Sequence, residues 1–253
     1  MRTLRATAHL TARSLRESLQ QPALEIGNIF IPIFFFAVTV GAIGGVAGRA
    51  FGFENYLGFQ MPVAVLQGVA GAAGSSGIAM VTDIERGYFD KLLLTPAPRV
   101  SLLLGRLAAD AVRVMVITLL ILAGGLATGS GMQAGPLGVL LILAISGAFG
   151  ISYAGIGVAI ALRTGSAQAA QASFLLFFPL LFLSPAFAPK EFFSPWLEFL
   201  ATINPVTYIL EAMRDLVLEG WDWPSLAKGL ASIAGLGGFS LSLSLAALRS
   251  RTA

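Results

Sequence analysis

The sequence predicts an all-α integral membrane protein, built as a single domain over residues 1–253, with six transmembrane helices and an amphipathic helix ahead of the first. Composition is the first reason: 56% of the residues are hydrophobic and 11% are charged, against about 45–50% and about 25% in soluble domains. Charge spacing is the second, because charge-free intervals recur at the roughly 20-residue length that crosses a bilayer core. The pattern excludes a soluble globular domain and predicts that membrane lipid surrounds the chain.

Residues 1–25 are expected to form the amphipathic helix. At 100° per residue, their apolar side chains gather in one arc and their arginines in the opposite one. Pro22 breaks this helix before the first span. A helix of this kind lies in the membrane interface. It serves either as a plain anchor or as a surface that also touches a cytoplasmic subunit.

Six spans follow from the charge-free intervals. Four intervals hold one helix each, while the 49-residue interval between Arg113 and Arg163 holds two. Glycine and proline at 129–136 divide it, where a turn outside the membrane is expected. The predicted spans are residues 26–48, 58–82, 111–128, 137–162, 166–187 and 229–248.

The basic residues predict the orientation in the membrane. With the N-terminus inside, twelve of the 16 lysines and arginines fall in cytoplasmic segments and four fall outside. Positive charge favours the cytoplasmic side, so both termini are expected in the cytosol, in a multi-pass arrangement that fits a bacterial inner membrane. The same bias accounts for most of the net charge of +3 without a nucleic-acid partner.

The loop over residues 83–100 carries the densest charge in the chain. Ile84 to Leu94 is predicted to form a short helix that stops before Pro96, since the residue preceding a proline avoids the helical conformation. Acidic and basic side chains alternate there beside aromatic ones, a composition that suits contact with another protein. The alternative is that these charges only solvate the loop.

Two segments carry a resemblance to a known family. Residues 85–96, ERGYFDKLLLTP, resemble the first cytoplasmic loop of ABC-2-type permeases, the membrane subunits of ATP-driven exporters. Residues 182–187, FLSPAF, and residues 204–208, NPVTY, resemble the exit of the family's fifth helix and its N-P-x-T-Y segment. Both occur in the family's order and are closest to the daunorubicin-type drug exporters. Tyr88 and Pro185 depart from it, standing where the family often has threonine and glycine.

The resemblance implies a half-transporter, in which two six-helix subunits, identical or homologous, sit above two cytoplasmic ATPase subunits that hold ATP and magnesium. This chain has no G-x-x-x-x-G-K-[ST] phosphate loop, and it is expected to bind no cofactor or metal and to carry no catalytic residue. By resemblance, the short loop helix is the coupling helix that seats in the ATPase. The residues implied in that contact are Asp83, Glu85, Arg86, Tyr88, Phe89, Lys91, Leu93 and Thr95.

The predicted spans hold no ionisable residue at depth, which disfavours an ion-coupled carrier. The single histidine, His9, leaves no H-E-x-x-H site for an intramembrane protease. A pathway must then use apolar and weakly polar side chains on the second and fifth spans, whose alternative role is interhelical hydrogen bonding. The candidate pathway residues are Gln60, Gln67, Ser75, Gln168, Gln171, Phe174 and Phe178.

Residues 188–227 form the predicted outer segment, where interfacial aromatic side chains mix with turn residues. The resemblance implies short re-entrant helices there, with a bend at Asn204 and Pro205 and with Tyr208 beside it. The predicted function is the permease subunit of an ABC exporter that moves an amphipathic or hydrophobic substrate outward. The alternatives are a polysaccharide or glycolipid exporter permease, and an ATP-independent scaffold or flippase of the same fold.

Overall fold

The computed structural model describes residues 2–20, 22–94 and 98–252, and these segments fold into helices without any strand. The helices, in chain order, are α1 (Arg2–Leu19), α2 (Pro22–Phe51), α3 (Tyr56–Glu85), α4 (Tyr88–Leu93), α5 (Arg99–Ala127), α6 (Gly135–Thr164), α7 (Ala167–Leu175), α8 (Phe177–Phe182), the 3-10 helix η1 (Lys190–Phe192), α9 (Pro195–Ile203), α10 (Pro205–Leu218) and α11 (Trp223–Thr252). The all-α prediction is therefore confirmed for the described residues.

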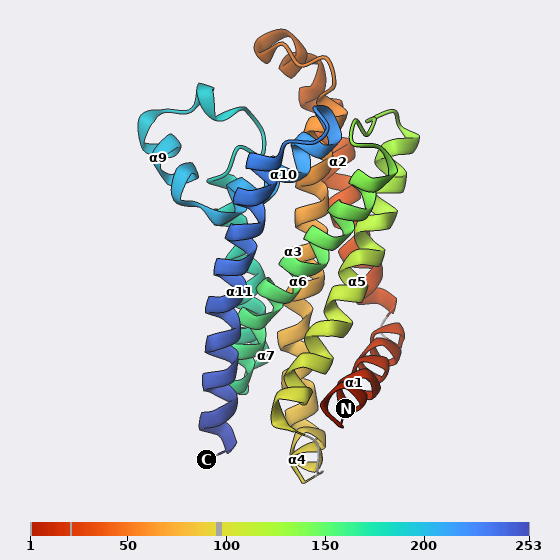
Figure 1. Cartoon of the computed structure of the whole chain (residues 1–253), viewed down its shortest axis with the longest axis vertical. Helices are drawn as coiled ribbons and strands as arrows, with labels where there is room; N and C mark the ends of the chain where they lie inside the picture. Colours follow the sequence, from red (N-terminus) through yellow and green to blue (C-terminus); the bar gives the residue numbers. More distant parts are fainter. Residues whose placement is uncertain (1, 21, 95–97, 253) are drawn as a thin grey trace.

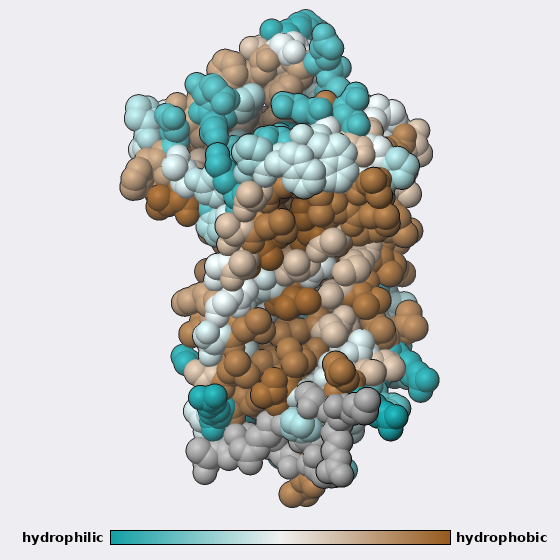
Figure 2. All heavy atoms as spheres, in the orientation of Figure 1, coloured by the Kyte–Doolittle hydropathy of each residue, from teal (hydrophilic) through white to brown (hydrophobic). Residues whose placement is uncertain are grey.

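Five of these helices are long and apolar enough to cross a membrane. They are α2, α3, α5, α6 and α11, each with an apolar stretch of 27 to 30 residues. On the face shown in Figure 2, hydrophobic side chains form a belt around the bundle, with hydrophilic side chains gathered beyond it at the α9–α10 end. The chain is a multi-pass membrane protein.

The predicted span over 166–187 is not one continuous helix. It consists of α7, with nine residues, and α8, with six, and the apolar stretch Ala167–Phe182 is shorter than the other five. Pro179 explains the break, because a proline has no N–H to donate to the carbonyl of Leu175 four residues earlier. The prediction of an unbroken helix is corrected here.

The short loop helix also differs from its prediction. It was expected to begin at Ile84, but α3 runs on through Glu85 and α4 begins only at Tyr88. Gly87 lies between the two helices with a φ of +64°, a left-handed conformation that glycine adopts without steric cost. Asp83 and Glu85 consequently belong to the end of a membrane helix rather than to the loop helix.

Helices α3 and α6 form the centre of the bundle. Helix α3 packs against α2, α5, α6, α7 and α10, while α6 also packs against α5 and α11. Figure 1 shows both termini and α4 at one end of the molecule, with α9 and α10 at the opposite end. The central position of α3 matters because it connects the α4 end of the molecule to the interior.

The contact between α3 and α6 depends on a glycine. A Cβ at Gly77 would lie 2.7 Å from the carbonyl oxygen of Gly157, too close for an ordinary contact. We expect Gly77→Ala to lower the free energy of unfolding by about 1–3 kcal/mol through overpacking. At Gly41 an added Cβ would meet nothing within 4 Å. Gly41→Ala should therefore leave the free energy of unfolding unchanged or raise it slightly. Unfolding in mixed detergent micelles measures both, and equal effects would contradict this account of the packing.

Candidate functional site

The α4 end of the molecule presents charged side chains to its surroundings. Glu85, Arg86, Asp90 and Lys91 are all exposed there. Phe89 points the other way, since it is 2% exposed and belongs to the main hydrophobic core. The result is a short helix that is anchored by one aromatic side chain and charged on its accessible surface.

Two residues predicted to contact an ATPase are instead turned into this subunit. Phe89 is one of them, because its ring packs into the main hydrophobic core. Asp83 is the other: it is 6% exposed and both of its carboxylate oxygens are occupied by arginines. Neither side chain is exposed on the surface of this subunit. Thr95 lies outside the described residues, as does the side chain of Leu93.

Asp83 is held by arginines from two other helices. Nη2 of Arg13, on α1, lies 2.8 Å from Oδ1, and Nη1 of Arg106, on α5, lies 3.0 Å from Oδ2. Arg13 also stacks over the ring of Tyr88 on α4, with 3.5 Å between its Cζ and the ring centroid. Burial lowers the pKa of Arg13, but the hydrogen bond and charge of Asp83 outweigh this and raise the pKa overall.

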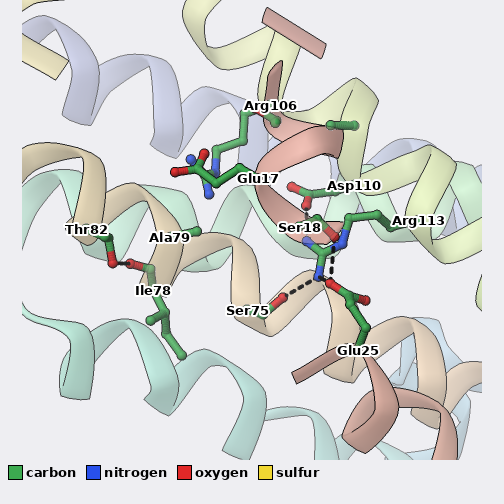
Figure 3. A pocket seen from close by; sticks show the side chains of 12 residues that line it. Glu17, Ser18, Glu25, Ser75, Ile78, Ala79, Thr82, Arg106, Asp110 and Arg113 are labelled. Carbon is green, nitrogen blue, oxygen red and sulfur yellow. Dashed lines mark hydrogen bonds and ion pairs between the residues drawn. The ribbon is translucent and has the colours of Figure 1, made fainter. Parts of the chain in front are cut away.

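The polar contacts continue from Arg106 along α5 (Figure 3). Its Nε donates to the backbone carbonyl of Ser76 at 3.1 Å, and the hydroxyl of Ser76 donates to Asp110. Asp110 is 2% exposed, and its other oxygen accepts a bond of 3.1 Å from Arg113. A buried charge is costly unless it is paired and hydrogen-bonded, and each carboxylate in this series is.

Arg113 is the last arginine of the series and contacts two other helices. Its Nη2 lies 2.6 Å from Oε1 of Glu25 on α2 and 2.9 Å from the hydroxyl of Ser75 on α3. The hydroxyl of Ser18, on α1, donates to the same Glu25 oxygen at 2.8 Å. We call the connected set the ionic network; its members are Arg13, Asp83, Arg106, Ser76, Asp110, Arg113 and Glu25.

A groove opens on the other side of Ser75. Helix α3 forms its floor, and α2 and α7, which both pack against α3, form its walls. Most of the predicted pathway residues meet in it. The groove residues are Asn28, Gln67, Gly71, Ser75, Gln171, Phe174 and Phe178.

The groove combines aromatic and amide side chains. The rings of Phe174 and Phe178 meet edge to face, with centroids 5.2 Å apart. Opposite them, the Nδ2 of Asn28 is buried and has no hydrogen-bond partner within the described part of the chain. Gly71 leaves room for Asn28, because a Cβ at this position would lie 2.9 Å from its Oδ1. An amphipathic molecule fits such a lining better than a purely polar one.

Two predicted pathway residues lie apart from the groove. Gln60, near the start of α3, is only 2% exposed, and its Oε1 has no hydrogen-bond partner among the described residues. Gln168 is exposed near the start of α7, where it accepts a hydrogen bond from Ser166 at 3.1 Å. The seven-residue spacing of Gln60 and Gln67 therefore does not bring both to the same cavity.

At the opposite end, Asn204 separates α9 from α10. Its Oδ1 accepts from the N–H of Val206 at 3.0 Å and so caps α10, while its Nδ2 donates to the carbonyl of Leu180. Pro205 opens α10 as its first residue. The hydroxyl of Tyr208 donates to the carbonyl of Thr202 at 2.6 Å. The predicted bend thus lies between two helices and is tied back to α8.

Arg214, on α10, fixes this end to the bundle. It donates to the carbonyls of Phe59 and Pro185 at 3.2 and 2.9 Å and stacks over the ring of Phe59. Burial lowers its pKa to about 9. The cation therefore serves as a buried hydrogen-bond donor that joins α3, α10 and the segment after α8.

A family model for ABC-2 type transporters matches residues 5–218, which is most of the chain. The chain belongs to the ABC-2 type transporter family. This ABC-2 chain carries both the exposed α4 and the groove within the matched region.

Curated relatives share the same region. One is the "Daunorubicin resistance ABC transporter permease protein DrrB1" of Streptomyces coeruleorubidus, 27% identical over 197 residues that make up 78% of this chain and 69% of the relative. Another is the "Probable doxorubicin resistance ABC transporter permease protein DrrC" of Mycobacterium tuberculosis, 27% identical over 86% of this chain and 77% of the relative. The "Putative transport permease ycf38" of Cyanophora paradoxa is 29% identical over 82% of this chain and 72% of the relative.

The sequence reasoning missed the ionic network of this ABC-2 chain. None of its ion pairs was predicted from the sequence. A signal was present, because Arg106, Asp110 and Arg113 recur at helical spacing and therefore share one face of α5. Asn28 was also missed, and its single amide inside an apolar run gave a weaker signal.

Proposed function

We propose that this chain is the permease subunit of an ABC exporter that moves amphipathic, drug-like molecules outward and is driven by ATPase subunits on separate chains. The match to the ABC-2 family over residues 5–218 carries the proposal. The names of two relatives, which refer to daunorubicin and doxorubicin resistance, support the substrate class. The proposed assembly contains two permease subunits, identical or homologous, and two ATPase subunits that bind ATP and magnesium.

In this proposal α7 and α8 complete a sixth passage through the membrane, and α9 and α10 lie at its outer surface. The location of both termini and α4 at one end of the molecule supports the arrangement (Figure 1). That end is proposed to face the cytosol, in a bacterial inner membrane. The excess of basic residues in its segments agrees with the positive-inside rule.

Helix α4 is proposed as the coupling helix. Asp90 and Lys91 are exposed on α4, and Glu85 and Arg86 are exposed just before it, at the end of α3. Tyr88 connects α4 to Arg13. Phe89 holds the helix against the core, so that a push on α4 is transmitted to α3. The contact to the ATPase is thus proposed to be electrostatic, with the aromatic anchors inside the permease.

The groove is proposed as part of the substrate pathway. Its aromatic walls suit an apolar ring system, and the amides of Asn28 and Gln67 suit polar substituents. We propose doxorubicin as the probe. Inside-out vesicles that contain the complex are expected to accumulate it with ATP and not without. Accumulation of a glycolipid in place of doxorubicin would favour the glycolipid-exporter alternative, and ATP-independent movement would favour the flippase.

Substitutions in the groove should lower affinity for the substrate without abolishing ATP hydrolysis. We expect Phe174→Ala to raise the half-saturating doxorubicin concentration by about tenfold, because one stacking ring is worth roughly 1–1.5 kcal/mol. Gln168→Ala, on the same helix but outside the groove, is the matched control and should leave the value unchanged. Equal values for both variants would contradict a substrate contact at Phe174.

A further inference from the structure

We propose that Arg113 is a positioning residue through which the coupling end of the subunit sets the width of the groove. The inference rests on the proposed function, since it assigns regulation to the same groove. It depends on one geometric fact: Arg113 is bonded both to a wall and to the floor of the groove at their α4-facing end. No substrate contact is assigned to Arg113 itself.

The wall contact is made through Glu25. This carboxylate lies on the first turns of α2, three residues before the groove residue Asn28, so a shift of Glu25 is carried to Asn28 through less than one helical turn. Its partner Nη2 of Arg113 lies 2.6 Å away. Little of the rest of α2 is buried within this subunit, and α2 packs mainly against α3. The ion pair adds a direct polar tether between this wall and α5.

The floor contact is made through Ser75. Its hydroxyl accepts from the same Nη2 at 2.9 Å and donates to the carbonyl of Ala72 at 2.7 Å. Ser75 lines two cavities: the groove on one side and the polar cavity around Arg113 on the other (Figure 3). One nitrogen atom thus holds α2 and α3 together at the point where the groove closes.

The coupling end reaches Arg113 without a gap in the ionic network. Tyr88 on α4 contacts Arg13, and Arg13 and Arg106 share Asp83. Arg106 and Asp110 share Ser76, and Asp110 pairs with Arg113 at 3.1 Å. Every link is a direct contact between side chains or to a backbone carbonyl. A displacement of α4 therefore changes the positions of the charged groups around Arg113. This in turn changes the ion pair between Arg113 and Glu25.

The surroundings of the Arg113 side chain leave room for such a change. The Nε of Arg113 is buried and has no hydrogen-bond partner among the residues that the structure describes. A polar cavity lies beside it, lined by Ser14, Glu17, Ser18 and Thr82 among others. The guanidinium is thus held by three groups, while its Nε has no partner in the described part of the chain. This suits a side chain that exchanges partners when the helices move.

The test uses the purified complex in lipid vesicles, with ATP hydrolysis and doxorubicin transport measured in the same sample. Arg113→Gln removes the donor of the tether to α2, and Glu25→Gln removes its ionic component, since the amide oxygen of glutamine is an uncharged and weaker acceptor. We expect ATP hydrolysis to persist and doxorubicin moved per ATP to fall about tenfold, a common size for coupling between sites. Arg163→Gln is the matched control, because Arg163 is exposed on α6 outside the network, and it should transport as the wild type does.

Each other outcome has a defined meaning. Normal transport per ATP in both Arg113→Gln and Glu25→Gln overturns the inference and leaves the proposed function intact. Hydrolysis and transport that fall in proportion, with a lower melting temperature, also overturn it by showing a merely structural role. If Arg113→Gln does not assemble, the isosteric Glu25→Gln decides alone. A wild-type complex that hydrolyses ATP without moving doxorubicin overturns the proposed function and, with it, this inference.

Discussion

Replacing Glu85 and Arg86 together by alanine should abolish ATP-driven transport while the subunit still folds and inserts. Both side chains are exposed at the end of α3, where the chain turns into α4, so their removal disturbs no packing and should change the free energy of unfolding by less than about 0.5 kcal/mol. The proposed ATPase contact would lose one charge of each sign. Stimulation of ATP hydrolysis by doxorubicin and transport in vesicles should both fall at least about tenfold.

The matched control for this double variant is Arg49→Ala with Glu198→Ala. These residues form another exposed acid and base, located on α2 and α9, and their loss should leave coupling unchanged. Unaltered transport in the Glu85→Ala, Arg86→Ala variant would show that α4 is not the coupling helix. Equal losses in both double variants would point to a general effect of surface charge.

The largest effect on stability is expected at Asp83. Removing one partner from a buried ionic group typically costs about 3–5 kcal/mol, because uncompensated charge remains buried. Asp83→Ala leaves both Arg13 and Arg106 without this carboxylate, and the side chain of Arg106 is only 9% exposed. We therefore expect a loss of that size, measured by unfolding in mixed detergent micelles.

A second ion pair provides the comparison. Lys190 and Glu211 lie 3.0 Å apart, but the lysine side chain is 43% exposed, and such pairs contribute about 0–1 kcal/mol. Lys190→Met should accordingly lower the free energy of unfolding by no more than about 1 kcal/mol. If Asp83→Ala were as mild as Lys190→Met, Asp83 would not be the buried junction of α1, α3 and α5 that the structure shows.

The five long apolar helices were largely predictable from charge spacing. The long spans are defined by hydrophobic length alone, so α2, α3, α5, α6 and α11 were anticipated with shifted ends. The break between α7 and α8 was not, although Pro179 lies within the run. Prolines at Pro32 and Pro62 sit inside continuous helices, so a proline alone does not tell a broken span from an intact one.

Individual residues of the candidate site were predictable from the sequence, but the contacts between them were not. Residues 85–96 indicated the place of α4, and the polar and aromatic side chains of the second and fifth predicted spans included Gln67, Phe174 and Phe178, which line the groove. The inward direction of Asp83 and Phe89 could not be anticipated, because it depends on α1 and α5 packing beside them. Partners such as Glu25 and Arg113 lie 88 residues apart, a separation that no local pattern encodes.

The central claim, that this chain is powered by a separate ATPase, is tested most directly by purification from its native membrane in mild detergent. Mass spectrometry of the stoichiometric companions is the readout. We predict recovery of a soluble subunit that carries the G-x-x-x-x-G-K-[ST] phosphate loop, together with a second permease copy or homologue. Recovery of the chain alone or only with itself, after crosslinking has excluded losses in detergent, would contradict the claim and favour a scaffold or an ATP-independent flippase.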